Sequence, residues 1–471
     1  MSSSKDDSRA KMHEYWTEHS TKASLVEMML DENADKISQF DMDEIATMVP
    51  SLKGKRILEL GAGIGRYTGW LAEQAENVVA VDFIDKFIKR NEEINGSKGN
   101  IEFVCADATK LAFPPNSFDI VFSNWLLMYL TDEETFKLLQ NVLSWLTDDG
   151  FLFFRESCNK PSGSKKRGEN PTIYRKLGDY DDILNSVTMP MPGDGNSVLG
   201  FELLLVRSNQ AYVNIKKNPF QLCWLAQKSK VSVSDKHGCR SLHEFLDKKH
   251  YSKKDIAKFD LLLGHLAEES GTSSADETAS VSSSNGPLFS RDGRLMACTA
   301  KHLNLKNDEE VLEVGCGAGW GAFYLAEEFG VRVYAIDLSA NMIEKALQLF
   351  DDRYKHHNIL FEMTDALQRD FTEARFNAIY CCDTLLHIEN KTNLFVNFCK
   401  WLKPGGRVVI AELCIGNKDV KNEELKKYIQ ERHFYLNTAD EINEVCLFSY
   451  TISFLCIAIS ADVKIIRIYL R

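Results

Sequence analysis

One block of sequence occurs twice in this chain, at residues 57–66 and again at residues 311–320. In each copy an apolar strand leads into a glycine-rich turn and the start of a helix. An acidic residue then follows at the end of a second strand, at Asp82 in the first copy and at Asp337 in the second. This arrangement is typical of a Rossmann-like half-domain that binds a nucleoside. The repeat therefore predicts two nucleoside pockets, or one working pocket and one relic.

The bulk composition is that of a globular protein and argues against several classes of partner. A chain of 471 residues is too long for a single ordinary core. The net charge of −12 disfavours a polyanionic partner such as nucleic acid. The 12 cysteines show neither a CxxC pair nor zinc spacing, and no signal-peptide pattern follows the polar N-terminus. We therefore expect a cytoplasmic protein with reduced thiols, no metal ion, no nucleic-acid partner and no membrane partner.

Strand and helix patterns alternate in both halves, which predicts parallel sheets with helices on both faces. Residues 12–50 are expected to form helices that lead into the first sheet, and Phe201–Arg207 with Phe220–Gln227 to form a closing antiparallel hairpin. Parallel strands of the first half are expected at Arg56–Leu60, Val78–Asp82, Ile101–Cys105, Ile120–Ser123 and Phe151–Arg155. Those of the second half are expected at Glu310–Val314, Arg332–Asp337, Ile359–Met363, Ala378–Cys381 and Arg407–Glu412.

Two segments fit neither pattern. Residues 268–286 have almost no apolar content, so we expect a flexible linker there. Residues 445–461 are uncharged and largely apolar, but this run is shorter than the roughly 20 residues that a transmembrane helix needs. Buried strands, an alternative chain end and a membrane anchor are all compatible with it. Because the second half has fewer residues after its fifth strand than the first half, we expect its domain to be incompletely closed.

The residues around the first glycine turn narrow the type of nucleoside. Glu59 lies two residues before the first glycine, where a carboxylate can hold the ammonium of an amino-acid moiety. Asp82 suits paired ribose hydroxyls, because an ionised carboxylate accepts two hydrogen bonds. Asp107 ends the third strand, where an acid can accept from an adenine amino group, and Asp365 has the same place in the second half. In this order, these features resemble the class I S-adenosylmethionine-dependent methyltransferases.

A more specific resemblance comes from segments that follow the fourth and fifth strands. Residues 162–167 combine a glycine, two hydroxyls and three cations, which can surround a phosphate, although a solvated charged loop has the same composition. Together with the glycine turn, these segments are similar to those of the tandem phosphoethanolamine N-methyltransferases of plants and nematodes. The similarity covers residues 14–228 and 288–436. The runs that carry it are residues 58–68, 124–130, 155–158 and 170–175.

The resemblance implies two Rossmann-like α/β methyltransferase domains in tandem, with S-adenosyl-L-methionine as the cofactor and a small phosphobase as the substrate. The first domain is expected to methylate phosphoethanolamine to phosphomonomethylethanolamine, on the route to phosphocholine and phosphatidylcholine. The residues that the glycine motif or the resemblance places at the cofactor are Glu59, Gly61, Gly63, Gly65, Arg66, Asp82, Asp107, Ala108 and Asn124. The residues implied around the phosphobase are Ser157, Ser162, Gly163, Arg167, Tyr174, Arg175 and Lys217.

Methyl transfer to nitrogen requires an amine whose lone pair is free. A primary ammonium with a pKa near 10 is mostly protonated at neutral pH, so the site must remove a proton and align the reacting atoms. Tyr15 and His19, on a helical lid, and Tyr129 are the candidate catalytic residues. Aromatic faces can stabilise the methylated cation, and His19 or Tyr129 can pass the proton on. Packing in the core is an equally simple explanation for the side chains of His19 and Tyr129.

The second copy departs from the pattern of the family. The family's second domain resembles Ser-Arg-Asp at the position of Cys381-Cys382-Asp383. Cys382 therefore takes the place of the arginine, and a permanent charge that a phosphate needs is missing. His387 matches the family's catalytic histidine, but residues 286–298 lack the tyrosine-containing segment that works with it. We therefore expect a degenerate second domain, as in the nematode enzymes that perform only the first methylation, with a second enzyme cooperating in the later ones.

Two alternatives remain from the sequence. One chain could perform all three methylations to phosphocholine, or the chain could be a membrane-tethered, non-catalytic binding protein. The expected organisation is a helical lid at 1–50, a catalytic methyltransferase domain at 51–230, a helical connector at 231–267, a linker at 268–286, a degenerate methyltransferase domain at 287–440 and an apolar tail at 441–471.

Overall fold

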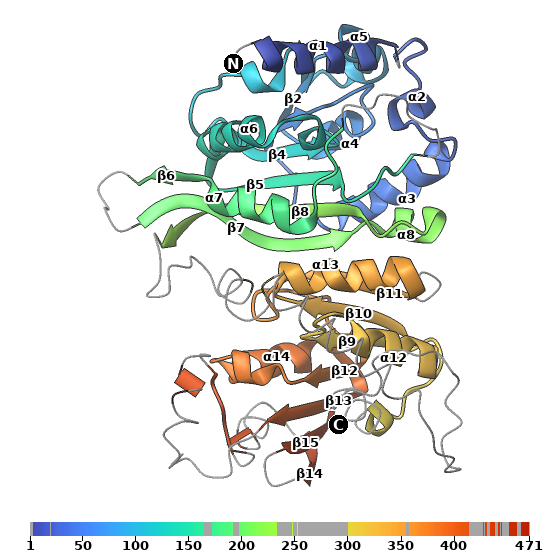
Figure 1. Ribbon diagram of the computed structural model, residues 1–471, viewed down its shortest axis with the longest axis vertical. Coiled ribbons are helices and arrows are strands. Elements are labelled where there is room, and N and C mark those ends of the chain that lie inside the picture. Colours follow the sequence, from blue (N-terminus) through green and yellow to red (C-terminus); the bar gives the residue numbers. More distant parts are fainter. Residues whose placement is uncertain are drawn as a thin grey trace. The chain divides into compact units, whose positions relative to one another are not determined.

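The computed structural model divides into two compact units, Met1–Ser241 and Leu242–Arg471, whose elements are labelled in Figure 1. It describes residues 3–18, 20–163, 172–191, 197–232, 300–354, 358–413, 452–458 and 463–470, with isolated positions 247, 252, 427, 429, 430, 434–438, 441, 442 and 444.

The first unit begins with three helices, as the pattern over residues 12–50 predicts. These are α1 (Ser3–Glu18), α2 (Leu25–Met29) and α3 (Ala34–Ala46). The strands are β1 (Arg56–Leu60), β2 (Asn77–Asp82), β3 (Ile101–Cys105), β4 (Phe118–Asn124), β5 (Leu146–Ser157), β6 (Thr188–Pro190), β7 (Ser197–Ser208) and β8 (Gln221–Ser232). The other helical elements are α4 (Thr68–Gln74), α5 (Asp85–Asn95), η1 (Gly96–Lys98), η2 (Ala108–Lys110), η3 (Leu127–Tyr129), α6 (Asp132–Trp145), α7 (Leu177–Ser186) and α8 (Gln210–Lys216).

The first sheet has the order β3-β2-β1-β4-β5-β8-β7, with β6 paired to β7. Strands β1 to β5 run parallel, and β8 is antiparallel to both β5 and β7. The parallel strands read as nearly continuous apolar runs because helices cover both of their faces. The five predicted strands and the closing hairpin are confirmed. The sequence did not predict α8, a short helix inserted between the two strands of the hairpin.

The core of the first unit joins the sheet to helices from both sides of the glycine turn. Ile45 on α3 and Leu71 on α4 are fully buried in one cluster with Ile57 on β1. In the same cluster the rings of Phe122 on β4 and Phe153 on β5 stack with their centroids 5.0 Å apart. This packing fixes α3 and α4 against the sheet that carries the glycine turn, and the carboxyl ends of its strands form the edge where parallel α/β sheets bind ligands.

The second unit repeats the same strand order. Its strands are β9 (Glu310–Val314), β10 (Arg332–Asp337), β11 (Ile359–Met363), β12 (Phe376–Cys382), β13 (Leu402–Leu413), β14 (Ile452–Ala458) and β15 (Val463–Leu470), in the order β11-β10-β9-β12-β13-β15-β14. Its described helical elements include η5 (Lys301–Leu303), α12 (Trp320–Phe329), α13 (Ala340–Leu349), the π-helical turn η6 (Phe350–Tyr354), η7 (Leu385–His387) and α14 (Lys391–Trp401). Strands β9 to β13 pair in parallel, as the second repeat predicts.

The C-terminal segment differs from the expectation of an unclosed domain with an apolar tail. Strand β15 pairs antiparallel with β13, and β14 pairs antiparallel with β15. These two strands take the places that β8 and β7 have in the first unit, so the second sheet reaches the same strand order. Part of the uncharged run at 445–461 is therefore strand β14. Among the described residues, no helix has the length and apolar character needed to cross a membrane.

Candidate active site

The glycine turn after β1 brings backbone N–H groups to the end of β2. Gly61, Gly63 and Gly65 have φ values of +73°, +54° and +86°, which side chains rarely allow. The N–H of Gly63 donates to Asp82 Oδ2 at 2.9 Å, and the N–H of Ile84 donates to Asp82 Oδ1, also at 2.9 Å. Burial raises the pKa of Asp82 to about 6, although these N–H donors oppose the rise. Asp82 is thus ionised at neutral pH and held rigidly.

A cavity of about 960 Å³, including its part open to solvent, lies beside this turn. It is formed where β1 to β5 end, and helices α1 and α2 contribute the rest of the wall. Its lining consists of Met12, Trp16, Met28, Met29, Leu30, Gly61, Gly63, Val81, Asp82, Phe83, Ile84, Phe87, Ala106, Asp107, Ala108, Asn124, Trp125, Leu126, Met128, Tyr129, Leu130, Ser157 and Ser162.

Aromatic rings close one side of the cavity. The ring of Trp16 on α1 meets the ring of Tyr129 on η3 edge to face, with a centroid distance of 5.5 Å. Trp16 also contacts Tyr15 at 5.6 Å and Phe87 at 6.2 Å. Edge-to-face pairs of this kind add to the stability of an apolar cluster. Their π faces also offer a cation-binding surface next to the cavity.

The turn that carries Tyr129 is held by a buried carboxylate. Glu156, near the end of β5, accepts the backbone N–H groups of Leu126 at 3.1 Å, Leu127 at 2.7 Å and Met128 at 3.2 Å. Burial raises the pKa of Glu156 to about 7, against the opposing effect of these donors. The side chain thus satisfies three N–H groups that the turn leaves without a backbone partner.

Arg175 holds the same turn from its carbonyl side. Its Nη1 donates to the carbonyl of Leu127 at 2.8 Å and its Nη2 to the carbonyl of Leu130 at 2.5 Å, while Nε pairs with Asp132 at 2.8 Å. Arg175 does not line the cavity. Its described contacts therefore place Arg175 behind the turn, whereas the resemblance implied that it contacts the substrate.

Two serines mark the far end of the cavity. Ser157 and Ser162 are both buried, and their hydroxyl oxygens lie 3.4 Å apart. Gln221 Nε2 donates to Ser157 Oγ at 2.8 Å. Hydroxyl groups arranged in this way can donate to an oxyanion.

The structure brings together about half of the residues predicted from sequence. The predicted residues that line the cavity are Gly61, Gly63, Asp82, Asp107, Ala108, Asn124, Tyr129, Ser157 and Ser162. Tyr15 packs in the aromatic cluster beside it. Gly163 directly follows Ser162 in the chain, Tyr174 is half-buried, and Lys217 is exposed at the C-terminal end of α8. His19 and Arg167 lie outside the described residues.

Three predicted cofactor residues lie behind the glycine turn instead of in the lining. Glu59 accepts a hydrogen bond from Thr68 Oγ1 at 2.5 Å, and burial raises its pKa to about 8. A Cβ atom on Gly65 would lie 2.1 Å from Asn91 Oδ1, which shows how closely the polar layer packs there. Arg66 turns toward α3, where its Nε donates to Ser38 at 2.8 Å.

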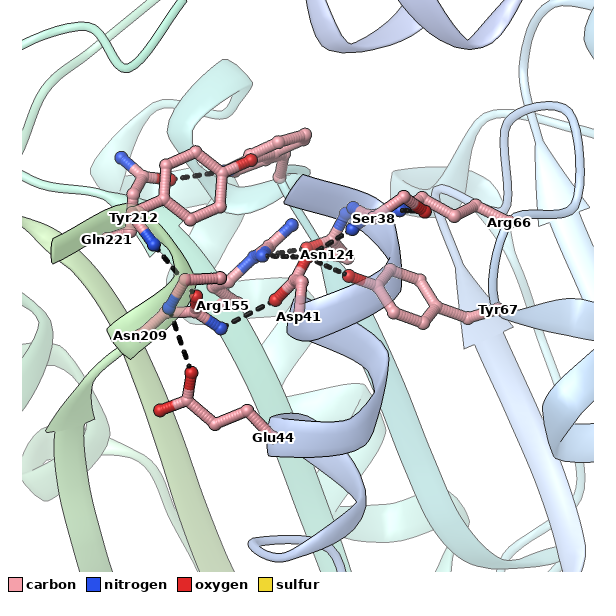
Figure 2. Close-up of polar contacts among 12 residues, drawn as sticks. Ser38, Asp41, Glu44, Arg66, Tyr67, Asn124, Arg155, Asn209, Tyr212 and Gln221 are labelled. Carbon is pink, nitrogen blue, oxygen red and sulfur yellow. Dashed lines mark hydrogen bonds and ion pairs between the residues drawn. The ribbon is translucent and has the colours of Figure 1, made fainter. Parts of the chain in front are cut away.

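Sequence reasoning missed the polar cluster around Asp41 on α3 (Figure 2). Asp41 lies in an ordinary helical pattern, and no local motif marks it. Arg155 carried a signal, because it is a charged residue at the end of an otherwise apolar strand. The methionines of the cavity wall also had no signal beyond helical spacing. Among the described residues, no group of His, Cys, Asp and Glu side chains could hold a metal ion.

The second unit preserves the cofactor side of this geometry. Gly317 N–H donates to Asp337 Oδ2 at 2.8 Å, and Ser339 N–H donates to Asp337 Oδ1 at 2.8 Å. Burial raises the pKa of Asp337 to about 6, as it does for Asp82. Glu412 accepts the N–H groups of residues 384 and 385 at 3.1 and 2.7 Å, in the role of Glu156.

Comparisons with known proteins agree with this geometry. Residues 58–154 and residues 311–406 each match a family model described as a methyltransferase domain. Phosphoethanolamine N-methyltransferase 1 of Triticum aestivum is 41% identical over 90% of this chain and 80% of that protein. The Caenorhabditis elegans protein of the same name is 37% identical over 47% of this chain and 48% of its own length.

Among solved structures, phosphoethanolamine N-methyltransferase 1 of Haemonchus contortus, in complex with phosphoethanolamine and S-adenosylhomocysteine, matches with a TM-score of 0.72. The match covers 98% of each chain at 23% identity. This match supports the tandem fold, and the Triticum aestivum relative shows the family. The chain therefore belongs to the phosphoethanolamine N-methyltransferase family, a family of S-adenosylmethionine-dependent enzymes with two methyltransferase domains in tandem.

Proposed function

We propose that the first unit transfers a methyl group from S-adenosylmethionine to the nitrogen of phosphoethanolamine and forms phosphomonomethylethanolamine. The observation that carries this assignment is a cavity whose lining includes two aspartates, two buried serines and aromatic rings. A nucleoside fits the aspartates, and a phosphate fits the serines. The aromatic rings offer a place where an amine and a sulfonium would meet.

The residues of the cavity fit the proposed cofactor. Asp82 offers a rigid carboxylate for ribose hydroxyls, and Asp107, whose Oδ1 accepts from Thr109 N–H at 3.0 Å, is placed for an adenine amino group. The glycine turn and Asn124 border the end where the amino-acid part would lie. S-adenosylmethionine supplies an electrophilic methyl group on a sulfonium. A Cβ on Gly63 would lie 2.6 Å from Met28 Sδ, so α2 packs directly over the bare backbone of the glycine turn.

The side chains of the chain account for the remaining requirements of the reaction. Ser157 and Ser162 hold the phosphate end, so the amine points toward the aromatic rings. Trp16 and Tyr129 exclude water there and offer π faces to the ammonium product. His19 and the Tyr129 hydroxyl, which releases its own proton as it accepts one, are the candidates to pass on the proton that the amine loses, and Tyr15 remains a predicted catalytic residue. Arg167, Tyr174 and Lys217 remain predicted phosphate ligands, and Gly163 a predicted backbone contact.

For the second unit we propose a structural role without methyl transfer. In the first unit 12 residues, including α8, separate β7 from β8. In the second unit only four residues separate β14 from β15. The connection that borders the serine end of the first cavity therefore has no equivalent of comparable length. Cys382, in place of a cation, removes a further group that a phosphate requires.

A labelled-methyl assay on the full chain tests this proposal. Phosphoethanolamine as the sole acceptor should be methylated once, and phosphomonomethylethanolamine as the sole acceptor should give at most about a hundredth of that turnover. A chain with no turnover of phosphoethanolamine would overturn the assignment of the first unit.

A second candidate function is the complete series of three methylations by this one chain. The Triticum aestivum relative aligns across both units, which is compatible with this candidate but does not favour it. Comparable turnover of the two acceptors in the same assay would establish this candidate and exclude a purely structural second unit. Loss of the second activity alone in a variant of the second unit would then assign the later steps to that unit.

A further inference from the structure

The carboxylate of Asp41 is the centre of a buried polar cluster behind the cavity of the first unit (Figure 2). Asp41 is fully buried on α3. Its Oδ2 accepts from Arg155 Nη1 at 2.6 Å, from the Tyr67 hydroxyl at 2.8 Å and from Arg66 Nη2. Its Oδ1 accepts from Asn209 Nδ2 at 2.5 Å. One carboxylate thus joins α3, the end of the glycine turn, the end of β5 and the residue before α8.

Asp41 is the acid with which both arginines of this cluster pair. Burial by itself would raise the pKa of Asp41, but Arg155, Arg66 and the hydrogen bonds outweigh burial, and the pKa lies below its ordinary value. Arg155 is fully buried and Arg66 is largely buried. Two guanidinium groups thus share one acid in a site without water access, so each depends on Asp41 for its position.

Arg155 connects Asp41 to two residues in the wall of the cavity. Its Nε donates to Asn124 Oδ1 at 2.7 Å, so the amide oxygen of Asn124 is turned toward Arg155 and its NH2 group is left for the cavity. The guanidinium carbon of Arg155 lies 4.2 Å from the centre of the Trp125 ring. Trp125 has a φ of +54°, an uncommon value for a bulky residue, and its N–H donates to the carbonyl of Arg155 at 2.9 Å.

The chain of contacts continues to the serine end. Trp125 Nε1 donates to Gln221 Oε1 at 2.9 Å, and Gln221 Nε2 donates to Ser157 Oγ at 2.8 Å. Side chains at both ends of the cavity are therefore connected to Asp41 through Arg155. Such a supporting layer fixes the geometry that transfer chemistry requires.

We infer that Arg155, held by Asp41, is a positioning residue that sets the amide of Asn124 and the ring of Trp125 for the bound cofactor. This inference rests on the proposed function of the first unit. The Asn124 NH2 group would then act as a donor toward an acceptor on the amino-acid part of the cofactor. Arg155 itself does not touch the ligand.

The test is a double-mutant cycle read by calorimetric binding of S-adenosylhomocysteine to the full chain. Arg155→Lys keeps the charge opposite Asp41 but cannot reach Asn124 with a second donor. We expect it to weaken binding about tenfold, the equivalent of one hydrogen bond. In the Asn124→Ala background the same change should weaken binding less than about twofold, because its effect passes through Asn124.

Arg207→Lys is the matched control. Arg207 is also a buried arginine that faces α3, where its Nη2 lies 3.7 Å from Glu44 Oε1, but it does not belong to the chain of contacts to Asn124. It should lower the melting temperature of the ligand-free chain as much as Arg155→Lys does, yet leave the affinity for S-adenosylhomocysteine unchanged. Equal losses of affinity in both variants would reduce Arg155 to a structural role and overturn the inference.

Asn124→Asp provides a second route if Arg155→Lys does not fold. The carboxylate still accepts from Arg155 but offers no donor to the cavity, so binding should weaken at least tenfold at an unchanged melting temperature. Full affinity in this variant, or additive losses in the cycle, would overturn the inference. Failure of the wild-type chain to bind S-adenosylhomocysteine would instead contradict the proposed function.

Discussion

The two units of this chain keep the same cofactor-side hydrogen bonds and differ, among the described residues, in the connection between their last two strands and in the Asn124–Arg155 pair. Asp82 and Asp337 each accept a glycine N–H from their turn, at 2.9 and 2.8 Å. Glu156 and Glu412 each hold the turn that follows the fourth strand. These features belong to the glycine turn and the parallel strands, so they persist wherever that scaffold folds.

The positioning layer, by contrast, exists in one unit only. Strand register pairs Asn124 with Arg155 in the first unit and Cys382 with Ala411 at the corresponding place in the second. The second unit thus has neither the amide that lines the cavity nor the arginine that orients it. The comparison teaches that the glycine turn and its aspartate can form without an asparagine–arginine pair beside them.

The largest effect should come from making the first unit resemble the second. Replacing residues 209–220 with Ile-Ser-Ala-Asp, the four residues between β14 and β15, removes α8 and Asn209. We expect kcat/KM for phosphoethanolamine to fall at least about 1,000-fold, because Trp125 loses the Tyr212 ring packed against it and Asp41 loses a donor. Steady-state kinetics measure this loss, with circular dichroism to confirm that the chain folds. Activity within about tenfold of wild type would mean that the missing α8 does not explain an inactive second unit.

A smaller effect on kcat should distinguish the two buried glutamates, Glu156 and Glu412. Glu156→Gln leaves one N–H of the turn facing an NH2 group, and about 1.5–3 kcal/mol of hydrogen bonding is at stake. We expect about a tenfold or greater loss of kcat with phosphoethanolamine, because the turn carries Tyr129. Glu412→Gln is the paired variant and should lower stability to a similar degree, measured by thermal unfolding, without changing kcat. Equal kinetic losses would show that both turns serve catalysis.

The smallest expected effect is a change in stability when Asp82 or Asp337 is replaced. The pKa of Asp82 in the folded chain, about 6, lies above its ordinary value of 3.8, and Asp337 has the same shift. The stability contribution of each carboxyl is therefore fully present below pH 3.8 and is lost as the pH rises through about 6. At pH 7.5 either Asp→Asn change should raise the melting temperature of the ligand-free chain by a few degrees.

The pH dependence of ligand binding, unlike the melting temperature, should distinguish Asp82 from Asp337. In the wild-type chain, affinity of the first unit for S-adenosylhomocysteine should fall as the pH drops below about 6, because protonated Asp82 accepts fewer hydrogen bonds from the ribose. This dependence should disappear in Asp82→Asn and persist in Asp337→Asn. A pH profile that neither variant alters would remove Asp82 from the cofactor site.

Much of this architecture could be predicted from sequence, because local patterns encode it. Glycine turns need positive φ, so the motif located Gly61 and Gly63, and apolar periodicity located the parallel strands. Asp82 and Asp107 follow from their places at strand ends.

The remaining features depend on contacts between residues far apart in the chain. Asp41 meets Arg155 across 114 positions and Asn209 across 168, and no local pattern records such pairs. The sequence left β14 undecided, because an uncharged run reads alike as buried strand or membrane segment, and it did not predict β15. Arg175 was placed at the substrate by resemblance, whereas its guanidinium caps the carbonyls of a turn.

The central claim is that one cavity, in the first unit, performs the transfer to phosphoethanolamine. Labelled-methyl transfer to phosphoethanolamine, measured side by side in Asp82→Ala and Asp337→Ala, tests it most directly. The account predicts that Asp82→Ala lowers kcat/KM at least about 100-fold, from the loss of charge-assisted hydrogen bonds to the ribose, and that Asp337→Ala stays within about twofold of wild type. Intact transfer in Asp82→Ala together with abolished transfer in Asp337→Ala would contradict the account.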